Sequence, residues 1–426
     1  MATIAYTSMN FTREPLKKAF GFKGDSMDEL WQVVSYIRLS DGVDGLGVGV
    51  QSVLWADSET FATYDQAGCN AMMLATTDYA LSCLNGKEFT NPQELIHKIY
   101  TDVYSYAKKC TCNDMLPATF VLDALVSVDF ALWQIWAKEN NVECFESIFK
   151  DFTSYSISRQ NSLCSVPLIS YNTTDEELVK LLEDGSSLLK IKIGSNPDGD
   201  NNLDKMVIWD TARVRHIHEI ASQYNTMHTE SGKPAYYLDA NGRYDTQERL
   251  MKFIDGISCL ASDVLILEEP YDETLEVNVS AIPFRVAGDE SIHSKEDAIH
   301  RIEDLGYGAV ALKPIAKTLS NTLEILDETS KRGIPCFCAD LTIPPVMLEW
   351  NMSIASRLTP IPGMRTGILE SNGKQNYVGW DRLLEITGHP HGTWLHSCNG
   401  IFNLRDFYER CNVMDIPEHY LKLVKR

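Results

Sequence analysis

Three acidic residues stand at the ends of short apolar runs in the second half of the chain. Asp239 ends Tyr-Tyr-Leu-Asp, Glu268 ends Leu-Ile-Leu-Glu, and Asp289 directly follows Val-Ala-Gly. Three carboxylates brought together repel one another, so one or more takes up a proton unless a cation holds the group. Oxygen ligands without His or Cys suit Mg²⁺. We therefore expect a Mg²⁺ site built from these acids, although each acid taken alone is equally explained as a cap at a strand end.

Lysines flank these acids in the sequence. Lys190 and Lys192 lie in the run Leu-Leu-Lys-Ile-Lys-Ile-Gly, and Lys313 ends Val-Ala-Leu-Lys. Residues two apart on a strand share a face, so the first two ammonium groups point the same way. The apolar flanks favour a buried strand, where such a pair is costly unless anions lie nearby. The alternative is an edge strand with a solvated lysine face.

A lysine next to a divalent cation and a second lysine has a lowered pKa and can act as a general base. The cation would stabilise the negative charge that develops when the proton α to a carboxylate is removed. Lysines on opposite strands would address opposite faces of the α-carbon. This arrangement predicts removal of the proton on one face and its return on the other.

Short apolar strands alternate with amphipathic helices over this part of the chain, which predicts a parallel sheet closed into a β/α barrel. The C-terminal strand ends of such a barrel form the active-site face, so the acids and lysines are expected around its mouth. The eight predicted strands cover 166–170, 188–193, 235–240, 264–268, 284–287, 309–313, 335–339 and 367–370.

The first part of the chain predicts a smaller α+β domain. Residues 31–39 and 46–55 read as a hairpin, and residues 91–109 and 118–139 as helices. Residues 10–29 are polar and without period, as in an active-site lid or a plain surface loop. We expect an N-terminal capping domain over residues 1–160, a barrel over residues 161–384, and an irregular tail, 385–426, that packs back on the cap.

The bulk composition restricts the partners. The 426 residues carry a formal net charge of −21, which disfavours nucleic acid and anionic membranes. Eleven cysteines are scattered without a Cys-x-x-Cys, which favours a reducing compartment. Neither a signal peptide nor an apolar run long enough to span a membrane is evident, so a cytoplasmic protein is expected.

Together these motifs resemble the enolase superfamily, and most closely its muconate lactonizing enzyme-like subgroup. The run Ala124 to Trp133 is similar to the helix that precedes the barrel in that family. The resemblance implies a modified (β/α)₈ TIM-type barrel with an N-terminal α+β capping domain, and Mg²⁺ as cofactor. It also implies the chemistry known for that superfamily, in which a Lys or His base works together with Mg²⁺.

The resemblance also assigns roles to residues. It makes Asp239, Glu268 and Asp289 the metal ligands, selecting Glu268 over the adjacent Glu269 and Asp289 over Glu290. It makes Lys192 the base on one face, with Lys190 supporting its charge, and Lys313 the base on the other face. A His–Asp dyad replaces that last lysine in the mandelate racemase subgroup, so Lys313 argues against that subgroup, and His293 is interpreted as the start of the following helix.

Substrate recognition is expected at the cap and at the last strand ends. Asn241 shares a face with Asp239 and is expected to orient a ligand or the substrate. Asp340 and Glu370 follow the seventh and eighth strands, and either receives an ammonium or hydroxyl group or caps a loop. Phe20 and Phe22 are candidates to close over the substrate. Dipeptide epimerases of the superfamily carry Asp-x-Asp on the eighth strand, whereas this chain has Glu-Ser-Asn there.

The predicted function is a Mg²⁺-dependent racemase or epimerase that moves the proton α to a carboxylate through an enediolate, using two lysines. The alternative is β-elimination by the same first step, as in an acid-sugar dehydratase, an o-succinylbenzoate synthase or a cycloisomerase. A non-catalytic metal-binding relative is a third possibility. The expected partner is a small-molecule carboxylate, and the expected assembly is a homo-oligomer.

Overall fold

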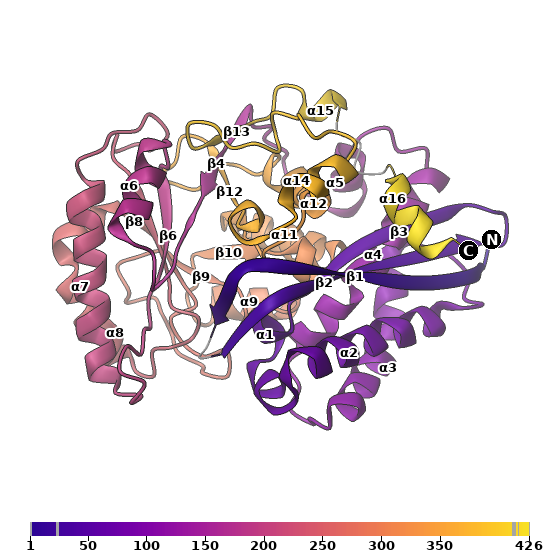
Figure 1. The fold of residues 1–426 in the computed structure, drawn as a ribbon, viewed down its shortest axis with the longest axis horizontal. Coiled ribbons are helices and arrows are strands. Elements are labelled where there is room, and N and C mark those ends of the chain that lie inside the picture. The colour runs from indigo at the N-terminus through magenta and orange to yellow at the C-terminus, as the bar shows by residue number, and fades with distance from the viewer. Residues whose placement is uncertain (1, 23–24, 411–414, 416, 426) are drawn as a thin grey trace.

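The computed structural model describes residues 2–22, 25–410, 415 and 417–425. Figure 1 shows two bodies side by side: a cap with a three-stranded antiparallel sheet, and a curled sheet surrounded by helices. The elements of the cap are β1 (Ile4–Phe22), β2 (Asp25–Leu39), β3 (Asp44–Gln51), α1 (Val53–Ala56), α2 (Ser58–Leu84), α3 (Pro92–Thr111), α4 (Ala118–Glu139) and α5 (Glu146–Phe152).

The first two strands form a long antiparallel hairpin that the sequence did not predict. Residues 10–29, expected to be an irregular loop, lie almost entirely in β1 and β2, with Phe11 opposite Val33 and Phe20 opposite Met27. That expectation of irregular structure is wrong. The sequence of β1 does not show the alternation of apolar and polar residues that marks a strand, because much of β1 is solvated, with Lys17 and Lys18 both exposed. The hairpin extends from the cap toward the barrel (Figure 1).

The helix predicted over residues 118–139 has those bounds as α4. It packs directly on β3, whose glycines alternate on one face; a Cβ on Gly47 would lie 1.9 Å from the backbone oxygen of Ser127. Only glycine permits this close approach of strand and helix backbones. Helix α4 is long and apolar enough to cross a membrane, but its most hydrophobic window is 94% buried in the protein, as in a core helix.

The barrel sheet has the strand order β13-β4-β12-β11-β10-β9-β8-β7-β6-β5. Strands β4 and β5 are separated only by Pro167; β4 pairs with β12 and β5 pairs with β6, so the sheet curls back on itself. The predicted β/α barrel is confirmed. Its strands are β4 (Ser162–Val166), β5 (Leu168–Ile169), β6 (Leu188–Lys192), β7 (Ala235–Asp239), β8 (Val264–Glu268), β9 (Val286–Gly288), β10 (Ala309–Leu312), β11 (Cys336–Cys338), β12 (Gly367–Glu370) and β13 (Ile401–Asn403).

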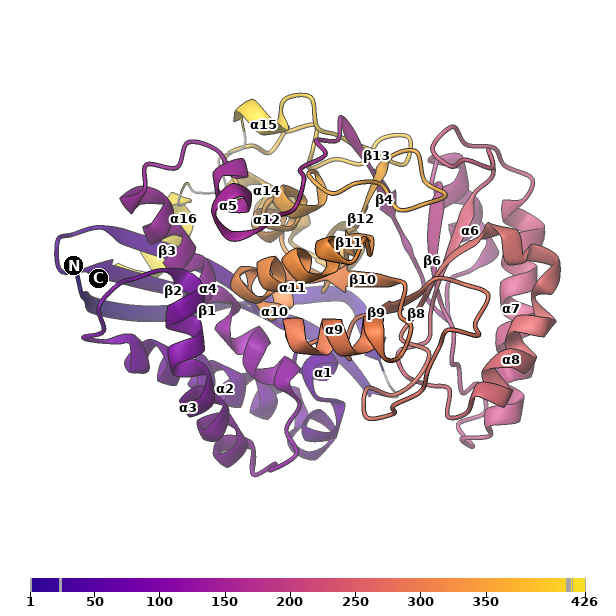
Figure 2. The same cartoon turned by 180° about the vertical axis from the view of Figure 1, so that it is seen from behind.

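Helices follow most strands and cover the outside of the barrel, with α7 and α8 at its far edge from the cap (Figures 1 and 2). They are α6 (Asp175–Glu183), α7 (Leu203–Ala221), α8 (Gln247–Gly256), the 3₁₀ helix η1 (Ser258–Asp263), α9 (Lys295–Glu303), α10 (Pro314–Lys317), α11 (Leu319–Lys331), α12 (Pro345–Ala355), α13 (Gly373–Asn376), α14 (Trp380–Ile386), α15 (Phe407–Arg410) and α16 (Glu418–Val424). In the tail, α16 lies on the cap, where the Ser8 hydroxyl donates to the Val424 carbonyl at 3.0 Å, while β13 pairs with β4 of the barrel. The domain boundaries at 160 and 384 stay a prediction.

A buried aspartate joins the cap to the barrel. Asp129 of α4 accepts from the backbone N–H of Leu319 at 2.7 Å and of Ser320 at 3.1 Å, and from the Ser320 hydroxyl. These N–H groups begin α11, so the carboxylate caps that helix. Burial raises the pKa of Asp129 to about 7, because the charged form is desolvated more than its hydrogen bonds stabilise it.

Replacing this residue is expected to loosen the junction. Asp129→Ala leaves two buried N–H groups without an acceptor, which costs about 2–4 kcal/mol of unfolding free energy. The folded state of the wild type holds a proton on Asp129 that the unfolded state loses above about pH 4. The contribution of Asp129 to stability therefore falls as pH rises to about 7, by up to about 1.4 kcal/mol per pH unit. Urea denaturation across this pH range measures both effects.

The matched control is Asp129→Asn, which keeps an acceptor oxygen and does not titrate. Its stability should gain on that of the wild type as pH rises from 4 to 7. Parallel pH profiles for the two proteins would contradict the raised pKa.

Candidate active site

The predicted strand-end residues surround one cavity of about 50 Å³ between the barrel mouth and the cap. Six carboxyl groups and three lysines line it, so the described lining carries an excess of negative charge that suits a cation. Phe20 and Met27 of the β1–β2 hairpin and Trp55 of α1 come from the cap, while the side chain of Phe22 lies outside the described part of the structure. The charged lining residues are Lys190, Lys192, Asp239, Glu268, Asp289, Glu290, Lys313, Asp340 and Glu370.

The two lysines of β6 do point the same way, and they do not form a solvated edge. Lys190 is 3% exposed, and its Nζ lies 2.9 Å from Asp239 Oδ2, 3.2 Å from Glu268 Oε1 and 3.1 Å from Glu370 Oε2. Burial opposes its charge, but these carboxylates outweigh burial and hold the pKa of Lys190 well above its ordinary value. Lys190 is therefore a fixed positive charge in the site.

Lys192 is more exposed than Lys190 and shares Asp239 with it. Its Nζ donates to Asp239 Oδ2 at 2.6 Å and to Asn241 Oδ1 at 2.5 Å. Burial raises the pKa of Asp239, yet Lys190 and Lys192 together lower it to about 2. Asn241 follows β7 with φ +44°, a conformation that non-glycine residues seldom adopt, and its N–H donates to Asp239 Oδ1 at 3.1 Å.

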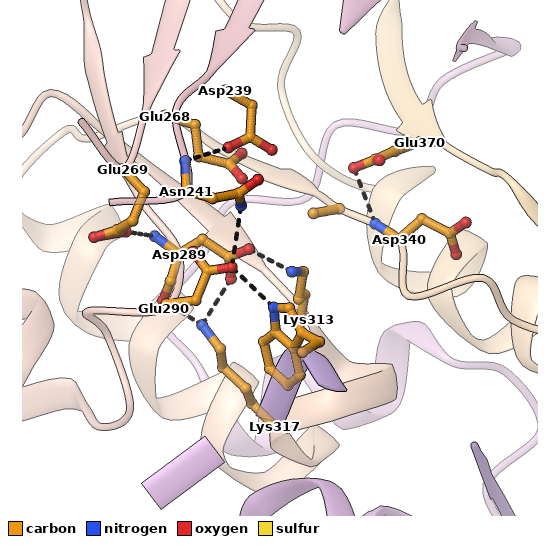
Figure 3. A network of polar contacts seen from close by, with 12 residues as sticks. Asp239, Asn241, Glu268, Glu269, Asp289, Glu290, Lys313, Lys317, Asp340 and Glu370 are labelled. Atoms are coloured by element: carbon orange, nitrogen blue, oxygen red, sulfur yellow. Dashed lines mark hydrogen bonds and ion pairs between the residues drawn. The ribbon is translucent and has the colours of Figure 1, made fainter. Parts of the chain in front are cut away.

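The opposite side of the cavity holds a second pair of lysines. Lys313 follows β10 and donates to Asp289 Oδ2, and Lys317, on α10, lies 2.9 Å from Asp289 Oδ1 (Figure 3). Despite burial, these two cations hold the pKa of Asp289 well below its usual range, and Asp289 in turn raises that of Lys313. A lowered lysine pKa is expected when a divalent cation is bound in the site. The carboxylates alone raise the lysine pKa instead.

Three carboxylates between the lysines can hold a metal ion. Glu268, Asp289 and Glu290 are buried and offer ligand oxygens that all lie within 4.8 Å of one another. Glu268 Oε2 and Glu290 Oε2 are buried and have no hydrogen-bond partner among the described residues. Burial, with Asp289 nearby, raises the pKa of Glu268 to about 7. Unpartnered carboxylate oxygens in a negatively charged cavity fit a hard cation such as Mg²⁺.

The geometry separates the predicted ligands into two groups. Glu268 and Asp289 belong to this trio, whereas Asp239 is held by the lysines of β6. Glu269 turns away with φ +41° and accepts from the Asp289 N–H at 2.6 Å, which fixes the next strand end. Burial, with Glu290 nearby, raises the pKa of Glu269 to about 8.

A third group of polar side chains lies where β11 and β12 end. The Asp340 N–H donates to Glu370 Oε2 at 3.1 Å, and the Asn372 N–H donates back to Asp340. Asp340 Oδ1 and Asn372 Oδ1 are buried without a hydrogen-bond partner in the described structure. Burial, with Glu370 nearby, raises the pKa of Asp340 to about 7. Figure 3 shows Asp340 and Glu370 set apart from the carboxylate trio.

Every predicted site residue except Phe22, whose side chain is not described, therefore lines the cavity, and further residues join them. Trp55 and Asn372 line the cavity and were not predicted; only Asn372 had a signal, since it lies two residues after Glu370 on the same face. Lys317, also not predicted, is not among the lining residues but contacts Asp289. His293 is placed just before α9, where its Nε2 lies 2.9 Å from Glu273, and it is not among the cavity-lining residues.

No protein-family profile matches the chain. An L-Ala-D/L-Glu epimerase of Thermotoga maritima is 26% identical over 163 residues, which covers 37% of this chain and 41% of that protein. The chain thus matches less than half the length of this curated relative.

Solved structures match over most of the chain. A mandelate racemase/muconate lactonizing protein from Herpetosiphon aurantiacus has a TM-score of 0.62 at 16% identity, covering 88% of this chain and 91% of its own. A dipeptide epimerase from Enterococcus faecalis, complexed with Mg and L-Leu-L-Tyr, has a TM-score of 0.60 at 16% identity, and the match covers 85% of this chain and 89% of that chain. An L-talarate dehydratase from Polaromonas, complexed with Mg and L-glucarate, has a TM-score of 0.59 at 16% identity, and the match covers 91% of this chain and 89% of that chain.

These comparisons confirm the fold that the resemblance implied. The chain has the fold of the enolase superfamily, and the proteins to which it is similar include epimerases, a mandelate racemase/muconate lactonizing protein and a dehydratase.

Proposed function

We propose that this protein is a racemase or epimerase that inverts the carbon α to a substrate carboxylate by proton transfer between Lys192 and Lys313. The observation that carries the proposal is the placement of these two amines on opposite sides of a buried carboxylate cluster. A substrate between them presents one face of its α-carbon to each lysine, so one amine removes the proton and the other ammonium returns a proton.

Mg²⁺ is the cofactor that we propose for this site, held by Glu268 and Asp289 with Asp239 as the third ligand implied by the resemblance. When bound, it would stabilise negative charge on the carboxylate oxygens of the substrate. Lys190 contributes fixed positive charge on the same side as Lys192. Asn241 keeps Lys192 in place through its amide oxygen.

The test is a panel of carboxylic acids in deuterated water with Mg²⁺, followed by NMR. The panel contains dipeptides such as L-Ala-L-Glu, N-acylated amino acids and aldaric acids such as L-glucarate. Incorporation of deuterium at the α-carbon together with inversion supports the proposal. If no acid in the panel exchanges its α-proton, the proposal fails.

β-Elimination is the second candidate, and the structural similarity to an L-talarate dehydratase favours it. It shares the removal of the α-proton but ends in loss of a β-substituent. The same panel separates the two functions, because elimination yields a keto acid or an opened ring where epimerisation yields an inverted acid.

We also propose that Asp340, with Glu370 and Asn372, binds a donor-rich group of the substrate such as an ammonium. The unpartnered oxygens of Asp340 and Asn372 are acceptors, so they suit a substrate group that donates hydrogen bonds. Asp340→Asn should raise KM about 10-fold for an amine-bearing substrate and leave kcat nearly unchanged, since it leaves in place Glu370, the member of this group that pairs with Lys190. An equal loss for substrates without an amine would contradict this role.

Phe20 and Met27 of the β1–β2 hairpin line the small cavity, of about 50 Å³, from the side of the cap, so we propose that the hairpin moves to admit the substrate. This is the lid role proposed for the hairpin.

A homo-oligomeric state and a cytoplasmic location remain proposals from the resemblance and the composition, and light scattering of the purified protein tests the first.

A further inference from the structure

A tryptophan of the cap contacts the lysine on the far side of the cavity from β6. The Nζ of Lys313 lies 4.5 Å from the ring centroid of Trp55, within the range of a cation–π contact. The indole N–H of the same residue donates to Glu290 Oε1 at 2.9 Å. One side chain of the cap therefore touches both a proposed base and a carboxylate of the metal-binding trio.

The backbone that carries Trp55 is fixed on both sides. Helix α1 has four residues, all buried. Before it, the Ser52 N–H donates to Asp123 Oδ2 at 2.9 Å, and after it the Thr119 hydroxyl donates to the Ala56 carbonyl at 2.6 Å. Asp123 and Thr119 both belong to α4, the core helix of the cap. The backbone that carries the indole is thus held by the core helix of that domain.

Two neighbours restrict the amine of Lys313. Asp289 takes one hydrogen of the ammonium, and the indole face covers another side. Asp289, Trp55 and Lys313 all line the cavity, so these two contacts hold the amine at its wall. Without the indole, four flexible side-chain torsions would let Nζ turn within the space that the ring now fills.

We propose that Trp55 is a positioning residue: it holds the Lys313 amine toward the substrate and couples this to the placement of Glu290. The proposal rests on the two-lysine function proposed above. It predicts the larger effect on the face of the substrate served by Lys313, because Trp55 contacts Lys313 directly, whereas its connection to Lys192 runs through Glu290 and Asn241. A tryptophan that merely stabilised the fold, or merely contacted substrate, would change both faces alike.

The experiment compares Trp55→Leu, Trp55→Phe and the wild type by crystallography and by exchange in deuterated water. The probes are L-Ala-L-Glu and L-Ala-D-Glu, and the epimer served by Lys313 is the one whose exchange Lys313→Met abolishes. We expect Trp55→Leu to displace Lys313 Nζ from its position beside Asp289 and to slow exchange of that epimer about 10-fold. Exchange of the other epimer should stay within 3-fold.

Trp55→Phe keeps a ring face without the N–H, so it should restore both the lysine position and the ratio of the two exchange rates. Trp136→Phe, at another buried tryptophan of the cap, is the matched control and should alter neither. Equal slowing of both epimers, or an unmoved Lys313 in Trp55→Leu, would overturn the proposal. If the wild type exchanges neither dipeptide, the function proposed for these substrates fails, and the crystal structures still decide the role of Trp55. If Trp55→Leu does not fold, Trp55→Phe and Trp55→His decide the role of Trp55.

Discussion

Lys313→Met is expected to lower the rate of epimerisation at least 1000-fold while the substrate epimer facing Lys192 still exchanges its α-proton. A positioned general acid or base contributes roughly 10²–10⁴-fold to a proton transfer. Inversion needs both lysines, so loss of either one stops it. Exchange on one face needs only the lysine of that face. After the amine has taken the α-proton it is an ammonium with three hydrogens, and it can return a solvent-derived one to the same carbon.

The reciprocal variant completes this test. Lys192→Met should stop inversion to the same extent and preserve exchange of the epimer that faces Lys313. NMR in deuterated water, started from each pure epimer, follows both reactions. Lys233→Met is the matched control, since Lys233 lies two residues before β7, at the opposite end of the strand from Asp239, and donates to the Ser222 carbonyl at 2.9 Å. Loss of exchange on both faces in each variant would mean that both lysines maintain the structure of the site and do not act separately on the two faces of the substrate.

The sequence was informative where structure and chemistry coincide along the chain. Buried parallel strands read as apolar runs, and in a β/α barrel their last residues meet at one edge. Lys192, Asp239 and Glu268 end three neighbouring strands, and hydrogen-bond register places Lys192 beside Asp239 and Asp239 beside Glu268. Both the barrel and the charged mouth were therefore predictable from local pattern alone.

Elements whose burial is set by distant parts of the chain were not predictable in this way. Helix α2 kinks at Asp65 and has little one-sided apolar pattern, because it packs among α1, α3, α4 and the sheet of the cap. Trp55 contacts Lys313 and Glu290 only once the cap docks on the barrel. Lys317 lies in the second half of a short helix that no periodicity marks. Such contacts depend on how elements distant in the sequence pack together, which local patterns do not encode.

Mg²⁺ should stabilise the wild type against unfolding, and Glu268→Gln should weaken Mg²⁺ binding at least 100-fold. A ligand at 100 times its Kd raises the unfolding free energy by about 2.7 kcal/mol. Glu268 stands at the centre of the site, with one oxygen on Lys190 and the other without a partner, so the amide variant loses the charge and an anionic ligand atom together. Calorimetric titration and thermal unfolding with and without Mg²⁺ measure the effect in the absence of any substrate.

The same titration decides which acid is the third ligand, the point on which resemblance and geometry differ. The resemblance selects Asp239, which must then share Oδ2 with Lys190 and Lys192 or release them. The geometry offers Glu290, whose Oε2 is already unpartnered beside Glu268 and Asp289. We expect Asp239→Asn to weaken Mg²⁺ binding at least 100-fold and Glu290→Gln about 10-fold, because the second loses only a nearby charge.

Glu349→Gln is the matched control for these variants. Glu349 is also buried, but it lies on α12 outside the cavity, and the amide retains an oxygen for the Trp394 indole N–H that now donates at 2.8 Å. Its Mg²⁺ affinity should stay within 3-fold of the wild type. A larger loss in Glu290→Gln than in Asp239→Asn would make Glu268, Asp289 and Glu290 the ligands and leave Asp239 as the counter-ion that orients Lys190 and Lys192.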